Sequence, residues 1–168
     1  THQGREFQVW TLDTVQAYKP ENRSVTQDVA WPWIQVSSFP NWMTIKSWYA
    51  GLTSSKSEIT PELISLADSL FANSKTTEAK IQKVHEFITD KIRYSSVSFR
   101  QAGYIPQSAI KSYTTRVGDC KDMSVLAQTL LKIVGVESNL VLVETRDESS
   151  AAWLPGLDFN HCILKTPR

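Results

Sequence analysis

Cys120 and His161 are the two side chains whose types and surroundings best suit chemistry. Cys120 stands in the run Gly118-Asp119-Cys120-Lys121-Asp122, and His161 follows about forty residues later in Phe159-Asn160-His161. A thiolate is a strong nucleophile, and a nearby imidazole can lower the pKa of the thiol and carry its proton. The pair therefore predicts thiol-based acyl transfer.

A predicted helix that opens at Cys120 strengthens this hypothesis. Apolar residues recur after Cys120 at three- and four-residue steps, and Gly135 stands where a C-terminal cap belongs. Cys120 is thus expected in or just before the first turn, where unpaired backbone N–H groups and the helix dipole favour a thiolate. The apolar positions are Met123, Leu126, Ala127, Leu130, Leu131 and Val134.

Each of these residues also has a purely structural interpretation. A lone cysteine in an amphipathic helix is usually a small core hydrophobe, although Asp119, Lys121 and Asp122 surround Cys120 with charge. A histidine in an alternating, strand-like run is ordinarily structural, and this applies to His161. Neighbours on a strand face opposite ways, so we expect Cys162 to be a buried packing residue that points into the layer away from Cys120.

The remaining histidines and the composition predict no metal and no cofactor. His85 lies at the edge of a helical apolar face and is expected to be structural, while His2 lies near the terminus. The two cysteines and three histidines have no metal-binding spacing, and the six glycines form no phosphate loop. A net charge of +1 gives no nucleic-acid footprint, and no apolar run is long enough for a bilayer.

The order of the predicted elements is strands, helices and then strands again. In residues 1–40, Phe7, Val9 and Thr11 alternate, as do Ile34 and Val36, which favours strands. Between the later helices, residues 94–116 show little periodicity, and a connection of that length is usually functional. Strands are expected near 138–146 and 159–166. Helices followed by an antiparallel sheet predict an α+β fold.

Three helices are expected between residues 41 and 93. Asn41 can cap the first, Thr60 with Pro61 the second, and Thr76 or Thr77 the third. Trp42 and Trp48, like Trp31 and Trp33 in the strands, are expected in the core rather than in a carbohydrate site. The predicted apolar faces are Trp42, Ile45, Trp48, Tyr49 and Leu52; then Ile64, Ala67, Leu70 and Phe71; then Ile81, Val84, Ile88 and Ile92.

Several of these segments together resemble the transglutaminase-like superfamily, whose bacterial members are similar to cysteine proteases. The resemblance spans roughly residues 42–168 and rests on the segments 115–122, 135–136, 140–145, 154–155 and 159–163. It implies a papain-like core in which the cysteine helix packs on the antiparallel sheet that carries the histidine. Cys120 would be the nucleophile and His161 its base.

The resemblance also implies a domain organisation. Residues 1–40 would be the last strands of a preceding β-sandwich domain, and residues 41–168 the transglutaminase-like core of a larger chain in the cell envelope, outside the cytoplasm. The family's triad has a third member, an aspartate or asparagine, but neither lies between His161 and Arg168. Because the sequence also begins at Thr1 rather than methionine, we expect a fragment or processed product whose acid either follows Arg168 or is missing.

Secondary site residues follow from the chemistry of acyl transfer. The oxyanion needs donors; the backbone N–H of Cys120 is the natural first, and the side chain of Gln107 or Tyr94 is a candidate for the second. Trp153, between the two late strands, either contacts substrate or packs in an ordinary hairpin loop.

Three functions remain open at this point. The leading hypothesis is a cysteine-dependent peptidase, amidase or transglutaminase-like enzyme that acts on a peptide or protein. The alternatives are a catalytically degenerate module that binds peptide or glycan, and a structural spacer within a larger envelope protein. Retention of both Cys120 and His161 favours the enzyme.

Overall fold

The computed structural model describes residues 8–14, 17, 34–96, 103–145 and 154–166. The chain divides into two units, Thr1–Ile34 and Gln35–Arg168. In the first unit, the described residues form neither helix nor strand, so the strands expected around Val9 and Thr11 are not found; Phe7 lies outside the described residues. Ile34 and Val36 are also outside any strand and are 54% and 79% exposed.

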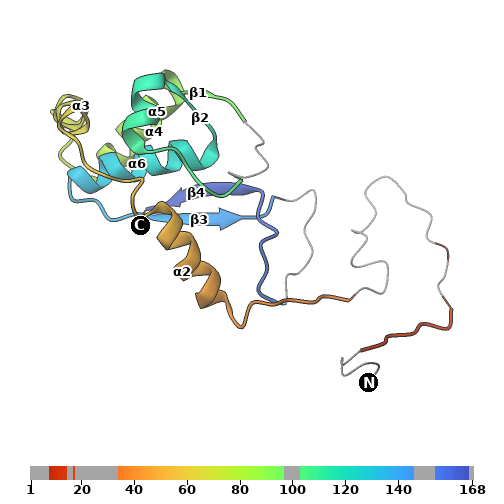
Figure 1. Cartoon of the computed structure of the whole chain (residues 1–168). Coiled ribbons are helices and arrows are strands. Elements are labelled where there is room, and N and C mark those ends of the chain that lie inside the picture. Colours follow the sequence, from red (N-terminus) through yellow and green to blue (C-terminus); the bar gives the residue numbers. More distant parts are fainter. Residues whose placement is uncertain (1–7, 15–16, 18–33, 97–102, 146–153, 167–168) are drawn as a thin grey trace. The chain divides into compact units, whose positions relative to one another are not determined.

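The second unit is an α+β domain, as the element order predicted. The helices are α2 (Trp42–Thr53), α3 (Pro61–Phe71), α4 (Thr77–Lys91), α5 (Ala109–Thr115) and α6 (Cys120–Ile133); the strands are β1 (Arg93–Tyr94), β2 (Val117–Gly118), β3 (Asn139–Val143) and β4 (His161–Lys165). Figure 1 shows α6 lying along the β3–β4 pair, with α3, α4 and α5 packed beside it.

The predicted helix starts are confirmed by their caps. The side chain of Asn41 accepts a hydrogen bond from the Thr44 N–H, and Thr60 and Thr76 cap α3 and α4 in the same way. Such caps satisfy backbone donors that have no partner inside the helix. At the other end of the cysteine helix, Gly135 takes a left-handed φ of 73°, which glycine adopts without strain.

The hydrophobic core is built around α6. Val125, Leu126 and Leu130 are fully buried there, and α6 packs against α3, α4, α5 and both late strands. On α3, Leu63 is fully buried, whereas Ile64, which the sequence placed on the core face, is 42% exposed. Ala67 and Phe71 are buried as predicted, so the error is confined to the first turn, where Leu63 and not Ile64 enters the core.

The described residues of this domain also form two small sheets. β3 and β4 pair antiparallel, with Val143 opposite His161, which confirms the predicted late strands. β1 and β2 pair in parallel, with Tyr94 opposite Gly118. The sequence did not predict β1, β2 or α5, all of which lie in or beside the stretch 94–116 that was expected to be irregular.

Arg116 joins α5 to β2 in an unusual backbone conformation. Its φ of 56° lies in the left-handed region, which a residue with a side chain seldom adopts. Its guanidinium carbon lies 4.3 Å from the ring centre of Tyr113 and 5.5 Å from that of Phe87. These cation–π contacts connect α4, α5 and the approach to Cys120.

The tryptophans of α2 are less buried than predicted. Trp42 and Trp48 are 43% and 36% exposed, while Ile45 and Tyr49 occupy the buried face of this helix. The indole rings instead contact other aromatic rings. Trp42 packs against Phe159 in a tilted arrangement, and Trp48 packs edge-on against Tyr104. Trp31 and Trp33 lie outside the described residues. Within the described residues, no helix has the length and apolar character of a membrane span.

The burial of Leu63 rather than Ile64 in α3 leads to a stability prediction. Leu63→Ala should lower the free energy of unfolding by about 2–5 kcal/mol, because it leaves a cavity beside α6. Ile64→Ala in the same helix is the matched control and should cost no more than about 1 kcal/mol. Urea unfolding followed by circular dichroism measures both; equal losses would contradict the described orientation of α3.

Candidate active site

Cys120 is the first residue of α6, as the sequence predicted. Asp119 is the N-cap, and its side chain accepts hydrogen bonds from the N–H groups of Lys121 and Asp122 at 3.1 and 3.2 Å. Asp122 completes a capping box by accepting the Asp119 N–H at 3.1 Å. The Asp119 carboxylate also forms an ion pair with the Lys121 ammonium group.

This cap leaves the N–H of Cys120 free. The Met123 N–H already bonds to the Asp119 carbonyl at 3.0 Å, so the following donors of the first turn are occupied. Among the described residues, none accepts a hydrogen bond from the Cys120 N–H. The donor beside the thiol is therefore available to an oxyanion, together with the positive end of the helix dipole.

Tyr94 is placed beside Cys120 by the short parallel sheet. The Arg93 N–H bonds to the Arg116 carbonyl at 2.8 Å and the Ser95 N–H to the Gly118 carbonyl at 3.0 Å, which holds Tyr94 against the residues before Cys120. Burial raises the pKa of the Tyr94 hydroxyl, and the nearby Cys120 and Asp119 side chains add to the rise. This hydroxyl therefore stays protonated and can donate a hydrogen bond.

His161 is the first residue of β4 and is held there by its neighbours. The Asn160 N–H bonds to the Val143 carbonyl at 3.2 Å, and the Asn160 side chain accepts the Thr145 N–H at 2.9 Å. The Tyr104 hydroxyl donates to the Phe159 carbonyl at 3.3 Å, just upstream. Asp158, the one carboxylate close before His161 in sequence, is exposed in the irregular segment that precedes β4.

Cys120, His161 and Tyr94 line the same cavity. Its volume is about 430 Å³, and it lies between α4, α6 and β4. Most of its wall is apolar, so a substrate group that enters it leaves water as it approaches the thiol. The other lining residues are Ile81, Val84, His85, Ile88, Met123, Ser124, Ala127, Leu131, Cys162, Ile163, Leu164 and Thr166.

The other predicted site residues have different surroundings. Gln107 is not part of this cavity wall, and its side-chain amide donates to the Asp122 carboxylate at 3.0 Å. The structure thus places Tyr94, but not Gln107, on the cavity wall with Cys120. Trp153 and His2 lie outside the described residues. His85, expected to be structural, is exposed at the cavity wall.

Cys162 is buried, as expected, but not in the layer away from α6. It is 3% exposed, its thiol shares a 3.6 Å hydrogen bond with the Tyr49 hydroxyl, and its carbonyl accepts from Ser124 of α6 at 3.3 Å. The prediction failed because Cys162 shares a strand face with Leu164, which packs against the helical core. Burial raises the pKa of the Cys162 thiol and, in the same cluster, that of the Tyr49 hydroxyl.

The part of the chain that the structure describes contains no cluster of side chains that could hold a metal ion. Within those residues, no three or more histidine, cysteine, aspartate or glutamate side chains gather as ligands. Among the residues that line the cavity, Cys120, His161 and Tyr94 supply a thiol, an imidazole and a phenol. These are the groups of thiol-based acyl transfer.

Comparison with known protein families identifies this arrangement. The model of the family described as "Transglutaminase-like superfamily" matches residues 64–163, from α3 to β4. The chain belongs to the transglutaminase-like superfamily. The match includes both Cys120 and His161, so the resemblance read from the sequence is confirmed, whereas a preceding β-sandwich is not shown.

Two solved structures are similar to this transglutaminase-like chain. One is a putative protease from Parabacteroides distasonis, with a TM-score of 0.57 and 16% identity over 77% of this chain and 25% of that one. The other is a putative cysteine protease from Cytophaga hutchinsonii, with a TM-score of 0.47 and 21% identity over 62% of this chain and 32% of that one. No curated protein matches the chain.

The comparisons agree with an α+β, papain-like core. The similarity to the Parabacteroides distasonis protein supports the fold alone, because the sequence identity is low. This chain spans only a quarter to a third of the two solved chains.

The two thiols should differ in reactivity. Limiting iodoacetamide near pH 7 should label Cys120 first, because Cys162 is buried and its raised pKa keeps it protonated. As the pH rises above about 8.5, the ordinary thiol value, labelling of Cys162 should still lag. Mass spectrometry of tryptic peptides measures both sites, and the urea-unfolded chain, in which both should react alike, is the control. Faster labelling of Cys162 in the folded protein would contradict the assignment of Cys120 as nucleophile.

Proposed function

We propose that this domain is a cysteine-dependent acyl-transfer enzyme that acts on amide or peptide bonds. The observation that carries the proposal is the shared cavity, which is lined by Cys120 at the start of α6 and by His161 at the start of β4. Membership of the transglutaminase-like superfamily supports the same chemistry. A structural cysteine would need neither a free N–H beside it nor a histidine in its cavity.

The reaction proceeds through a thioester. His161 accepts the Cys120 proton, and the thiolate sulfur attacks the substrate carbonyl carbon. As the carbon–nitrogen bond breaks, the imidazolium returns the proton to the departing amine. Water then hydrolyses the thioester, or a second amine takes the acyl group. Peptidase, amidase and transglutaminase activities share the first half of this scheme and differ in the acceptor that reaches the acyl-enzyme.

Two groups are suited to stabilise the oxyanion formed during attack. The Cys120 N–H is free among the described residues, and Tyr94 lines the same cavity as Cys120. Donors fixed before the reaction stabilise developing charge without reorganising, which makes them more effective than water. The preference is therefore for Tyr94 over Gln107 as the side-chain donor, since the Gln107 amide is bonded to Asp122.

A substrate for this site is a peptide or protein with an apolar side chain near the scissile bond. Apolar residues of α4 and α6 form most of the cavity wall beside Cys120. A carboxamide or peptide carbonyl at the thiol would place an adjacent side chain against them. Burial of such a group contributes roughly 25 cal/mol per Å² of apolar surface removed from water.

Substitution of the proposed catalytic pair tests this function. Cys120→Ala should abolish acylation by p-nitrophenyl acetate in a single turnover, and His161→Asn should slow it by about 10²-fold through loss of the base. Release of p-nitrophenolate and the mass of the acyl-enzyme are the measurements. Cys162→Ser is the matched control and should acylate at close to the wild-type rate. Acylation that moves with Cys162 instead of Cys120 would refute the proposal.

Removal of the Tyr94 hydroxyl tests the oxyanion site. Tyr94→Phe should slow acylation by on the order of 10², but iodoacetamide alkylation of Cys120 should be little changed, because alkylation forms no oxyanion. Tyr113→Phe, in α5, is the control for loss of a phenol hydroxyl. An equal loss of both reactions in Tyr94→Phe would indicate that Tyr94 acts on the thiol itself.

A further inference from the structure

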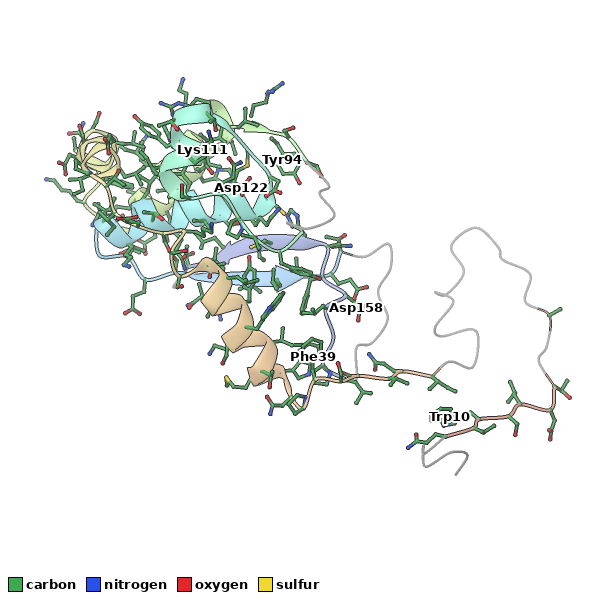
Figure 2. The ribbon with its side chains drawn as sticks, viewed as in Figure 1. Trp10, Phe39, Tyr94, Lys111, Asp122 and Asp158 are labelled. Carbon is green, nitrogen blue, oxygen red and sulfur yellow. The ribbon has the colours of Figure 1, made fainter. Side chains whose placement is uncertain are left out.

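Asp122 is a buried carboxylate next to the nucleophile that the proposed reaction does not use. Its side chain belongs to the first turn of α6, and the residue is only 5% exposed. In Figure 2, Asp122 and Tyr94 lie at the same end of α6. Burial of a carboxylate is costly unless hydrogen bonds replace the lost water, so its partners reveal what it holds together.

All three partners of this carboxylate are N–H donors from other positions. One oxygen accepts the Gln107 backbone N–H at 2.7 Å; the other accepts the Gln107 side-chain amide at 3.0 Å and the Asp119 N–H at 3.1 Å. Gln107 lies just before α5, fifteen residues from Asp122 in sequence. One side chain thus connects the segment before α5 to the N-cap of the cysteine helix.

Asp122 also packs directly on the backbone of β2. A Cβ atom added to Gly118 would lie only 2.8 Å from the Asp122 Cβ, so this approach is possible only with glycine. Gly118 is the strand partner of Tyr94. The same aspartate is therefore in contact with the residues that place both oxyanion donors, the Cys120 N–H through Asp119 and the Tyr94 hydroxyl through Gly118.

We infer that Asp122 is a positioning residue for acyl transfer, an inference that rests on the proposed function. It fixes the start of α6 against β2 and the Gln107 segment, so that the Cys120 N–H and the Tyr94 hydroxyl converge on one point. Asp122 touches no substrate in this role. Misplacement of catalytic groups by about 1 Å can cost on the order of 10² in rate, so a rigid anchor here has a large effect.

The donor pattern makes asparagine an informative replacement. An amide carries an NH₂ group in place of one oxygen, and every partner of Asp122 is itself a donor. In either orientation of the amide, the NH₂ group that Asp122→Asn introduces would therefore face an N–H group of Gln107 or Asp119, and a hydrogen bond would be lost. The orientation with fewer conflicts keeps the oxygen toward Asp119 and loses the bond to the Gln107 backbone.

The test compares two reactions of the same sulfur. Acylation by p-nitrophenyl acetate passes through an oxyanion, whereas alkylation by iodoacetamide does not. At a temperature where circular dichroism shows a folded protein, Asp122→Asn should slow acylation at least about tenfold and change alkylation of Cys120 by less than about twofold. Thr129→Val, which removes another buried polar group from α6, is the control and should change neither rate.

Gln107→Leu is the second variant and covers the case in which Asp122→Asn does not fold. It removes the side-chain bond but keeps the backbone bond to Asp122, so acylation should fall less, with alkylation again unchanged. A loss of acylation on the order of 10² in Gln107→Leu, as expected for an oxyanion donor, would make Gln107 act on the substrate directly. That result, or acylation within twofold of wild type, overturns this part of the inference.

The failures of the two hypotheses are distinguishable. Acylation within twofold of wild type in folded Asp122→Asn, or equal losses of acylation and alkylation, overturns the positioning role while the proposed function stands. A wild-type protein whose Cys120 is alkylated but never acylated overturns the proposed function and, with it, this inference.

Discussion

The cap at the start of α6 is the interaction on which the rest of the site depends. Every α-helix begins with backbone N–H groups that have no partner within the helix. Here Asp119 and Asp122 occupy the donors around Cys120, and within the described residues only the N–H beside the thiol stays free. The same hydrogen bonds that stabilise the helix therefore determine which donor of its first turn stays free among the described residues. Stability and chemistry share one set of contacts.

The partners of Cys120 reach it through strands too short to be stable alone. β1 has two residues, yet its pairing with β2 sets Tyr94 opposite Gly118. β4 brings His161 to the cavity from the end of a five-residue antiparallel ladder with β3. Both sheets depend on packing against α6, which contacts β2, β3 and β4. The core helix is thus also the reference against which each functional side chain is placed.

Local signals in the sequence predicted most of the framework and the reactive pair. Asn41, Thr60 and Thr76 were found as caps because a cap needs only its own next few residues. The two-residue strands β1 and β2 were missed, since so short a strand shows no alternation. The Asp122–Gln107 bond joins residues fifteen positions apart and leaves no local pattern. The capping-box spacing of Asp119 and Asp122 was a usable signal for half of that network.

Arg116 shows how such a framework restricts change in sequence. Its left-handed backbone costs roughly 1–2 kcal/mol relative to the ordinary helical region, and its two ring contacts offset part of that cost. Glycine would relieve the strain but lose both rings, while most other side chains would keep the strain and gain little. Arg116 is therefore difficult to replace without loss of stability, and the backbone that leads into Cys120 is fixed by packing against Phe87 and Tyr113.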